Sequence, residues 1–384
     1  MSLGAPVPFL LFGATLLGVA VFHRRSFEVA ITGLVVIAGH ALLTTDLDPA
    51  AHVAHEARLV ANLIGLLLGF AILAKQFEDS RVPDWLPRWL PDDWWGGFAL
   101  LVLVGVLSTF LDNIAAAMIG GVMANKLYQG RVSVGFLAAI VAASNAGGAG
   151  SVIGDTTTTM MWIAGVPALH VADALVGGIV AITVVGVIAA RAQQRVQPIQ
   201  KDPSGRPAID AGRLAVVALM IVGTIAANVL LDFPAAGLWG AIVVGSAVRS
   251  TPWAEIARAV KGSLFLCSLV LSASLMPVSS LPDPSWQSAL GLGFVSAVFD
   301  NIPLTALALY QGGYDWGLLA FAVGYGGSMI WFGSSAGVAI CNLFPEARNT
   351  GRWLAEGWYV AVAYVLGFFA MLAVFGWYPD ILPR

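Results

Sequence analysis

The stretch at 107–121 reads "LSTFLDNIAAAMIGG", and a related stretch at 295–309 reads "VSAVFDNIPLTALAL". Both copies place Asp-Asn inside a run that is otherwise apolar. A carboxylate and a carboxamide cost free energy in such surroundings unless they are hydrogen-bonded or bind something. Because both halves of the chain bear this cost, the pattern indicates one functional element that is built twice.

The composition places these stretches in a membrane protein. Of the 384 residues, 58% are hydrophobic and 11% are charged, and the mean hydropathy is +0.84. A soluble core of this length could not bury so much apolar surface, so we predict an all-α polytopic membrane protein in contact with lipid. The longest polar stretch is 191–213, which leaves no room for a catalytic or DNA-binding domain, and no nucleic acid partner is expected.

Segment lengths distinguish two kinds of apolar run. A helix that spans the bilayer needs about 20 residues, because each residue rises about 1.5 Å. The runs on either side of each Asp-Asn are shorter, so 96–127 and 285–310 are predicted to be re-entrant hairpins, alongside about 10 full spans. The predicted hairpin tips are Asp112, Asn113, Asp300 and Asn301.

Two other runs are too long for a single span and contain many glycines. The run 133–164 holds "SNAGGAGSVIGDTTTT", and the run 316–343 holds "GYGGSMIWFGSSAG". Each glycine weakens a helix by about 1 kcal/mol, and irregular backbone at membrane depth persists only where it lines a protein-enclosed cavity. Both runs are therefore predicted to be helices that break near mid-membrane.

The positive charges predict the orientation. All 19 Lys and Arg except Arg58 and Arg384 fall in alternate loops, which identifies those loops as cytoplasmic. This layout places both chain termini outside the cytoplasmic membrane. It also divides the chain into a first repeat at 1–190, a cytoplasmic linker at 191–213, and a second repeat of opposite topology at 214–384.

The two predicted repeats share more than Asp-Asn. Gly147-Gly148 with Gly154 has the same spacing as Gly326-Gly327 with Gly333. Inverted repeats with broken helices are typical of secondary transporters, whose binding site lies at mid-membrane between the repeats. The pattern therefore predicts transport by alternating access and not enzymatic catalysis.

Asp112, Asp155 and Asp300 are the three acids predicted to lie deep in the membrane. An ionisable group there is a functional candidate by default. The alternative is that Asp-Asn is ordinary turn chemistry and that Asp155 only caps a helix beginning at Thr156, although capping and ion binding are compatible. The predicted ion- and substrate-binding residues are Ser108, Asp112, Asn113, Asn145, Gly147, Asp155, Thr156, Thr157, Asp300, Asn301, Gly327, Ser334 and Ser335.

Hard oxygen ligands from Asp, Asn, Ser and Thr suit an alkali cation. The end of the first half-helix near Asn145 presents unpaired carbonyls, and the start of the second presents N–H groups. A Na⁺ ion is expected at Asp112, Asn113, Asn145 and Asp155. Ser334 stands where the first break has Asp155, so one half carries an extra acid, and competition of Na⁺ and H⁺ for a carboxylate gives exchange.

Other motifs carry less weight. His40 is interpreted as a structural histidine, and "HVAHE" at 52–56 resembles a metal pair but is placed in an acidic outer loop without a third ligand. Cys267 and Cys341 are expected to be small buried hydrophobes. The tryptophans in "PDWLPRWLPDDWW" are expected to anchor the chain at the membrane interface. No cofactor-binding motif is present, so no cofactor is expected.

The motifs resemble a known family. "ASNAGGAGSVIGDTTTTMMWIAGV" at 143–166 resembles the signature of NhaD-type sodium/proton antiporters within the ion transporter superfamily, and "GYGGSMIWFGSSAGVAI" at 324–340 resembles their second half. The resemblance implies exchange of Na⁺ or Li⁺ for H⁺. It implies that the ions are handled around Asp112-Asn113, Asn145, Asp155-Thr156 and Asp300-Asn301.

Related members of the superfamily carry citrate, dicarboxylates or arsenite, often as homodimers, so transport of an organic or inorganic anion is the main alternative. Glycine-rich loops and half-helix N-termini can hold carboxylates without Arg. Three nearby acids argue against an anion unless a cation travels with it. A non-transport protein, such as a structural subunit or a membrane enzyme, would show surface-exposed Asp-Asn turns and no closed central cavity.

Overall fold

The computed structural model describes residues 7–22, 25–201 and 208–379. The predictions for the two chain ends, and for part of the predicted linker, fall outside this part. Every regular element in the described part is helical, which confirms the all-α class. The first half forms α1 (Val7–Val21), α2 (Ser26–Thr44), α3 (Pro49–Asp79), α4 (Val82–Trp85), η2 (Leu86–Trp89), α5 (Trp94–Ser108), α6 (Asn113–Leu127), α7 (Val134–Ala149), α8 (Thr156–Ile163), α9 (Ala168–Ala172) and α10 (Ala174–Val196).

The second half continues with helices of similar length. They are α11 (Ala211–Leu231), α12 (Pro234–Ser246), α13 (Ala254–Ser274), η3 (Val278–Ser280), α14 (Trp286–Ser296), α15 (Asn301–Gln311), α16 (Trp316–Gly326), α17 (Ser335–Leu343), η4 (Pro345–Arg348), α18 (Thr350–Glu356) and α19 (Tyr359–Phe375). These helix bounds do not show where one repeat ends and the next begins, or that 191–213 is a linker. The division of the chain therefore stays a prediction.

Five helical segments in the described part are long and apolar enough to cross a membrane. They are α2, α3, the continuous stretch Ala168–Val196, α11 and α13, and the pair α18 and α19, bent by 59°, is a sixth if counted as one. Several shorter apolar helices, α5, α7 and α16 among them, accompany these spans. The chain is a multi-pass membrane protein, while ten spans with two re-entrant hairpins stays a prediction.

Helix α3 corrects one prediction. Asp48 caps its first turn by accepting hydrogen bonds from the N–H groups of Ala50 and Ala51, and Pro49 occupies the first helical position, where its missing N–H costs nothing. The helix then runs without interruption to Asp79. The placement of 52–56 in an outer loop is therefore wrong, because these residues form the second turn of α3.

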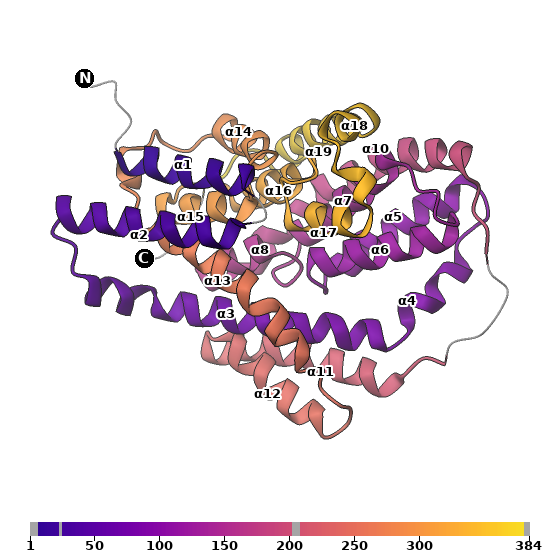
Figure 1. The fold of residues 1–384 in the computed structure, drawn as a ribbon, viewed down its shortest axis with the longest axis horizontal. Helices are drawn as coiled ribbons and strands as arrows, with labels where there is room; N and C mark the ends of the chain where they lie inside the picture. Colours follow the sequence, from indigo (N-terminus) through magenta and orange to yellow (C-terminus); the bar gives the residue numbers. More distant parts are fainter. Residues whose placement is uncertain (1–6, 23–24, 202–207, 380–384) are drawn as a thin grey trace.

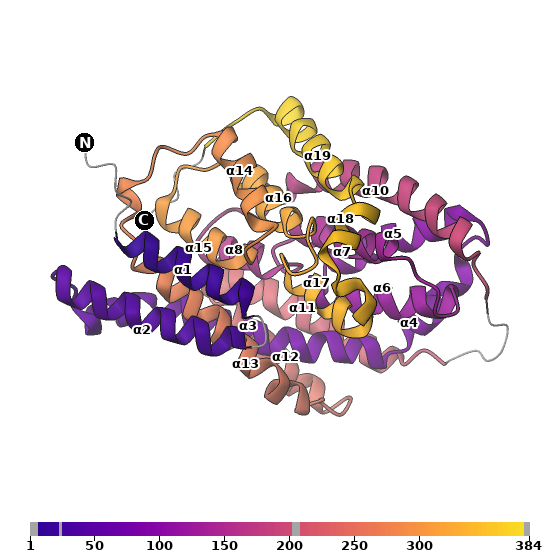
Figure 2. The ribbon, with the colours of Figure 1, turned by 45° about the horizontal axis from the view of Figure 1, so that its top comes forward.

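The helices form two packed groups around a central region (Figure 1). Helices α11 and α12 pack against each other and against α3, and α13 crosses α3 and packs against α2. On the other side, α10 packs against α5, α7 and α19. Figure 2 shows α19 at the opposite edge of the molecule from α12. The short helices α8, α15 and α17 lie between these two groups (Figure 1).

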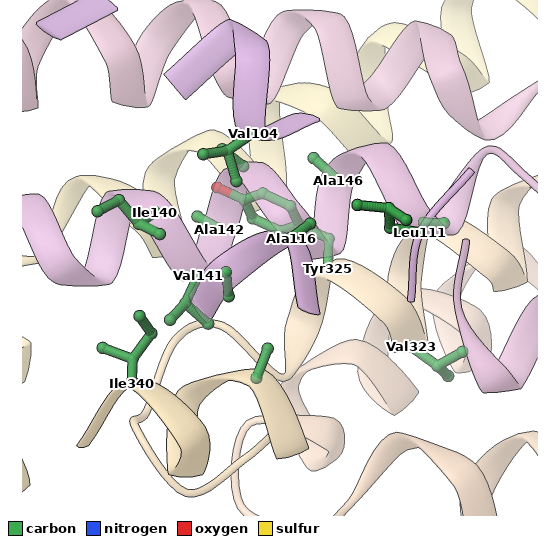
Figure 3. Close-up of a cluster of buried hydrophobic side chains, with 14 of the residues drawn as sticks. Val104, Leu111, Ala116, Ile140, Val141, Ala142, Ala146, Val323, Tyr325 and Ile340 are labelled. Atoms are coloured by element: carbon green, nitrogen blue, oxygen red, sulfur yellow. The ribbon is translucent and has the colours of Figure 1, made fainter. Parts of the chain in front are cut away.

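In the centre, elements of one half pack against elements of the other. Helix α6 packs against α17, α8 packs against α15, and α7 packs against α16. Figure 3 shows the apolar side chains that fill this region, with α5, α6 and α7 contributing from the first half and α16 and α17 from the second. The two Asp-Asn turns and both breaks are thus held by a core that neither half completes alone.

Glycines allow close helix crossings, and two of these crossings match between the halves of the chain. A Cβ atom at Gly147 of α7 would lie 2.0 Å from the carbonyl oxygen of Gly105 in α5, and one at Gly326 of α16 would lie 2.2 Å from that of Gly293 in α14. No side chain fits at either crossing. Small residues let membrane helices approach this closely, which fixes the broken helices against the arms that precede the Asp-Asn turns.

Candidate functional site

The glycine-rich runs break the helices as predicted. Helix α7 ends at Ala149 and α8 begins at Thr156, where the Asp155 carboxylate accepts a hydrogen bond of 3.3 Å from the Thr157 N–H. In the second run α16 ends at Gly326, and Ser334 caps α17 by accepting a 3.2 Å bond from the Gly337 N–H. The two breaks are confirmed, and the assignment of each helix pair to a single span stays a prediction.

The Asp-Asn turns have the same construction. Helix α6 begins at Asn113 with Asp112 at its N-cap position, and α15 begins at Asn301 with Asp300 at the N-cap. Asp300 accepts a 3.0 Å bond from the Ile302 N–H, whereas the Asp112 side chain makes no such bond. Three aspartates and one serine therefore stand at four helix N-termini, where the helix dipole favours negative charge.

Asn145 connects the first turn to the second break. Its Oδ1 accepts a hydrogen bond of 3.0 Å from Asn113 Nδ2. Its own Nδ2 donates to Ser328 Oγ at 2.9 Å and to Ser334 Oγ at 3.1 Å. All four side chains are buried. A single amide thus joins α6, α7 and the start of α17, and it connects Asn113 with Ser334 of the other half of the chain.

The acidic side chains form a second set of contacts. Asn301 Nδ2 on α15 donates to Asp155 Oδ2 at 3.4 Å, and Ser335 Oγ donates to Asp300 Oδ2 at 3.4 Å. Asp112 and Asp300 lie close enough for their charges to act on Asp155. These charges would repel one another, and a cation or a proton on one of the carboxylates would reduce that repulsion.

Three buried oxygens at this centre have no hydrogen-bond partner within the described residues. They are Ser108 Oγ at the end of α5, Asp112 Oδ1, and Thr157 Oγ1 in the first turn of α8. A buried polar atom without a partner costs about 1–3 kcal/mol, so such atoms need an explanation. Oxygens of this kind, with no Lys or Arg donor bound to them, are suited to a small cation.

A cavity of about 1140 Å³ reaches the centre from one side. It lies between α3, α6 and α13, and both Asp112 and Ser335 line its inner end. Its outer end carries basic residues from loops predicted to be cytoplasmic, namely Lys75, Arg81, Lys126, Arg213 and Arg258. Several of these are paired with acids, such as Lys126 with Asp84 at 2.6 Å and Arg258 with Glu255 at 2.6 Å. The cavity thus connects the first Asp-Asn turn with a charged rim.

The remaining predicted residues have structural contacts. Gly147 packs on Gly105, and a Cβ atom at Gly327 would lie 2.7 Å from the carbonyl oxygen of Gly333, so neither position accepts a side chain. Thr156 is the half-buried first residue of α8. Sequence reasoning missed Ser328, although it directly follows the second glycine pair, where an unwound backbone exposes side chains to the centre.

The histidine-containing start of α3 forms a separate polar cluster. Glu56 is buried and accepts a 2.7 Å hydrogen bond from the Tyr310 hydroxyl of α15, and His52 Nε2 lies 3.0 Å from Ser274 Oγ of α13. Within the described residues, no three His, Cys, Asp or Glu side chains are grouped as metal ligands. Sequence reasoning missed Glu56, because a short acidic motif next to a proline looked like a loop.

Comparison with known proteins places the chain in a family. The citrate transporter family matches residues 3–326. The chain belongs to this family of the ion transporter superfamily. This transporter is also similar to proteins named as sodium/proton antiporters. One of them is the Na⁺/H⁺ antiporter NhaD of Halomonas elongata, which is 27% identical over 80% of this chain and 74% of its own length.

Two more relatives extend the similarity. Sodium/proton antiporter 1 of Arabidopsis thaliana is 26% identical over 87% of this chain and 66% of its own length, and NhaD of Alkalimonas amylolytica is 25% identical over 92% and 86%. The chain thus spans just under two thirds of the Arabidopsis protein. The resemblance to the NhaD-type family is confirmed. Its members are transporters and not enzymes, and the ions in their names are substrates, with no cofactor.

Proposed function

We propose that the chain is a secondary active transporter that exchanges Na⁺ or Li⁺ for H⁺ across the cytoplasmic membrane by alternating access. The names of the relatives support cation/proton exchange. The three aspartates support it independently, because they concentrate negative charge and, within the described residues, none of them is paired with Lys or Arg. A carboxylate that binds either Na⁺ or H⁺ couples the two ions by competition.

The proposal rests mainly on the hydrogen bonding of Asp112 and on its access to the cavity. Its Oδ1 is buried without a hydrogen-bond partner among the described residues, yet the residue lines the inner end of the 1140 Å³ cavity. A carboxylate that only capped α6 would accept a bond from the helix N-terminus, as Asp300 does for α15. Asp112 instead keeps an acceptor available at the end of a route for hydrated ions.

In this proposal Na⁺ binds at Asp112, Asn113, Asn145 and Asp155. The two carboxylates supply charge. The hydrogen bond from Asn113 Nδ2 to Asn145 Oδ1 uses the amide nitrogen of Asn113 and leaves the Asn113 carbonyl oxygen for the ion. Ser108 and Thr157, whose hydroxyl oxygens are buried without partners in the described part, complete an oxygen-lined centre. Protonation of Asp155 or Asp112 removes the charge that holds the ion.

The inverted repeats and re-entrant hairpins are part of the proposal. The matched glycine contacts, Gly147 on Gly105 and Gly326 on Gly293, support two copies of one unit. The cavity separates α6 from α13, whereas its counterpart α15 packs against α13. This asymmetry supports a state open to one side, with the other side closed. The Lys and Arg residues at the rim support a cytoplasmic opening, with termini outside. We propose a homodimer as in related transporters.

Transport of an anion is the second candidate, favoured by the description of the matching family as citrate transporters. The four helix N-termini at the centre also suit carboxylates. Against it, the N-cap positions already hold three aspartates, and several of the basic side chains that line the cavity are paired with acids at its rim. A citrate ion would meet negative charge at the binding centre unless Na⁺ accompanied it.

Everted membrane vesicles that contain the protein test the two candidates. A respiratory substrate establishes the proton gradient, and Na⁺, Li⁺, K⁺ or citrate is then added while a pH-sensitive dye reports the gradient. We expect Na⁺ and Li⁺ to dissipate the gradient in vesicles with the protein and not in control vesicles. Absence of a response to every cation, together with accumulation of labelled citrate, would replace the exchange proposal with anion transport.

A further inference from the structure

The two breaks correspond position by position, which allows their chemistry to be compared. A Cβ atom at Gly148 would lie 2.7 Å from the Gly154 carbonyl oxygen, and one at Gly327 would lie 2.7 Å from that of Gly333. The correspondence pairs Asp155 with Ser334. It also pairs Asn145 of α7 with Gly324 of α16, since each stands two positions before the corresponding glycine pair.

At the second break an amide group occupies the centre. Asn145 Nδ2 donates one hydrogen bond to Ser328 Oγ and one to Ser334 Oγ, and both of these oxygens are buried. Asn113 fixes the amide orientation by donating to Asn145 Oδ1. The two serine oxygens therefore face a donor of partial positive charge that belongs to the protein and cannot leave.

At the first break the matching position holds no donor group. Gly324 presents no side chain, and a Cβ atom there would lie 3.4 Å from Asp155 Oδ2 and 3.0 Å from the Ala149 Cβ. Asp155 therefore receives no amide from α16. It accepts a hydrogen bond from the Asn301 side chain at 3.4 Å, which is the weak end of the range.

We propose that the Asn145 amide permanently fills the cation position of the second break, so that each chain holds a single exchangeable cation site, at the first break around Asp155. The inference rests on the proposed function and adds the number of Na⁺ ions that each chain binds. The two N–H donors of Asn145 satisfy the serine oxygens in the place of an ion, while Gly324 places no donor beside Asp155.

Counting bound ions tests the inference on the wild-type chain. The full-length protein in detergent is titrated with radioactive ²²Na⁺ at pH 8, and ion exchange is measured in proteoliposomes over the same concentrations. We expect one Na⁺ per chain and a Hill coefficient of 1. Two Na⁺ per chain, or a Hill coefficient near 2, would overturn the single site while leaving the exchange function intact. Absence of any Na⁺ binding would instead reject the exchange proposal itself.

Position 324 provides the matched variants. Gly324→Asn places a second amide beside Asp155, whereas Gly324→Ala adds only a methyl group. Both variants share the 3.0 Å approach of the new Cβ to the Ala149 Cβ, so this crowding cancels when the two are compared. We expect Na⁺ binding in Gly324→Asn to be at least 10-fold weaker than in Gly324→Ala. Gly291→Asn, in open space on α14, controls for the added amide. Unchanged Na⁺ affinity in folded Gly324→Asn would refute the proposal. If that variant does not fold, the wild-type ion count decides.

Discussion

Asn301 on α15 donates a 3.4 Å hydrogen bond to the Asp155 carboxylate at the start of α8, and so joins the two halves of the chain at their most acidic point. The bond is long, and the second Asp155 oxygen accepts only a 3.3 Å bond from the backbone of Thr157. Neither contact includes a cationic partner. Asp155 is thus held in position without having its charge neutralised, as an exchange site requires.

Asp155→Asn should abolish Na⁺-dependent dissipation of the proton gradient in everted vesicles. The amide has nearly the same shape and can still cap α8, but it carries no charge for Na⁺ or H⁺ to neutralise. We expect the rate of exchange to fall at least 100-fold while the protein remains in the membrane. Asp283→Asn, on an exposed segment, is the control and should keep wild-type exchange. Full exchange by Asp155→Asn would remove this residue from the site.

Gly147→Ala should destabilise the protein severely. The new methyl group would lie 2.0 Å from the Gly105 carbonyl oxygen, which is backbone and cannot rotate away. Overpacking typically costs about 1–3 kcal/mol, and here we expect the upper end, seen as loss of folded protein in detergent.

Gly240→Ala is the matched control, because α12 has open space at that position. It should be neutral or stabilising by about 0.5–1 kcal/mol, since alanine favours helix. Equal yields of folded Gly147→Ala and Gly240→Ala, measured by size-exclusion chromatography, would contradict the close crossing of α5 and α7.

The sequence was sufficient to locate the breaks and turns because their causes are local. The glycines of "SNAGGAGSVIGD" cannot sustain a helix, and Asp155 and Ser334 are capping residues whose preference acts within one turn. The same local reasoning placed turns at Asp112 and Asp300, although it did not predict that both residues occupy N-cap positions. Local reasoning could not predict the contacts of each side chain. The hydrogen bonds from Asn145 to Ser328 and from Asn301 to Asp155 join residues far apart in the chain.

The start of α3 shows where local reasoning fails. "TTDLDPAAHVAHEA" contains proline and several acids, which suggest a polar loop. In the structure Asp48 and Pro49 together start a helix, and tertiary contacts with α13 and α15 bury Glu56. Packing against distant helices thus overrides the polarity of the segment, and a single sequence carries no signal of that packing.

Tyr310→Phe tests the contact between α15 and α3. It removes the hydroxyl that donates to Glu56, which is only 4% exposed, and leaves the buried acceptor without this partner. We expect the free energy of unfolding to fall by about 1–3 kcal/mol. Glu56→Gln keeps an acceptor for Tyr310 and should cost less. Tyr378→Phe, on an exposed tyrosine, should change stability by less than about 0.5 kcal/mol in the same denaturation experiment.

Asp210→Asn should leave the pH profile of exchange unchanged. Hydrogen bonds from Arg249 hold the pKa of Asp210 below the usual range of an aspartate. The stability from this pair is present above the unfolded pKa of about 4 and is lost only as pH falls through the lower folded pKa. Between pH 6 and 9 the carboxylate is charged throughout, so the variant should lower thermal stability slightly and equally across that range. A shifted optimum for exchange would link Asp210 to the transported proton.

The cavity that reaches Asp112 predicts which side of the membrane has access to the centre. Met118 lines it on α6, and the two native cysteines, Cys267 and Cys341, are buried. Met118→Cys should therefore react with a membrane-impermeant maleimide added from the cytoplasmic side, in everted vesicles, and react at least 10-fold more slowly in right-side-out vesicles. This expectation follows from the basic rim of the cavity and the preference of positive charge for the cytoplasmic side.

Ala142→Cys, at a position 1% exposed in α7, controls for nonspecific access and should remain unlabelled from either side. Because Na⁺ binding would order the centre beside Asp112, saturating Na⁺ should slow labelling of Met118→Cys, and K⁺ at the same ionic strength should not. Faster labelling in right-side-out vesicles would reverse the proposed orientation while leaving the cavity intact. Equal and rapid labelling from both sides would contradict a cavity closed at one end, because alternating access requires that α13 and α15 seal the opposite side.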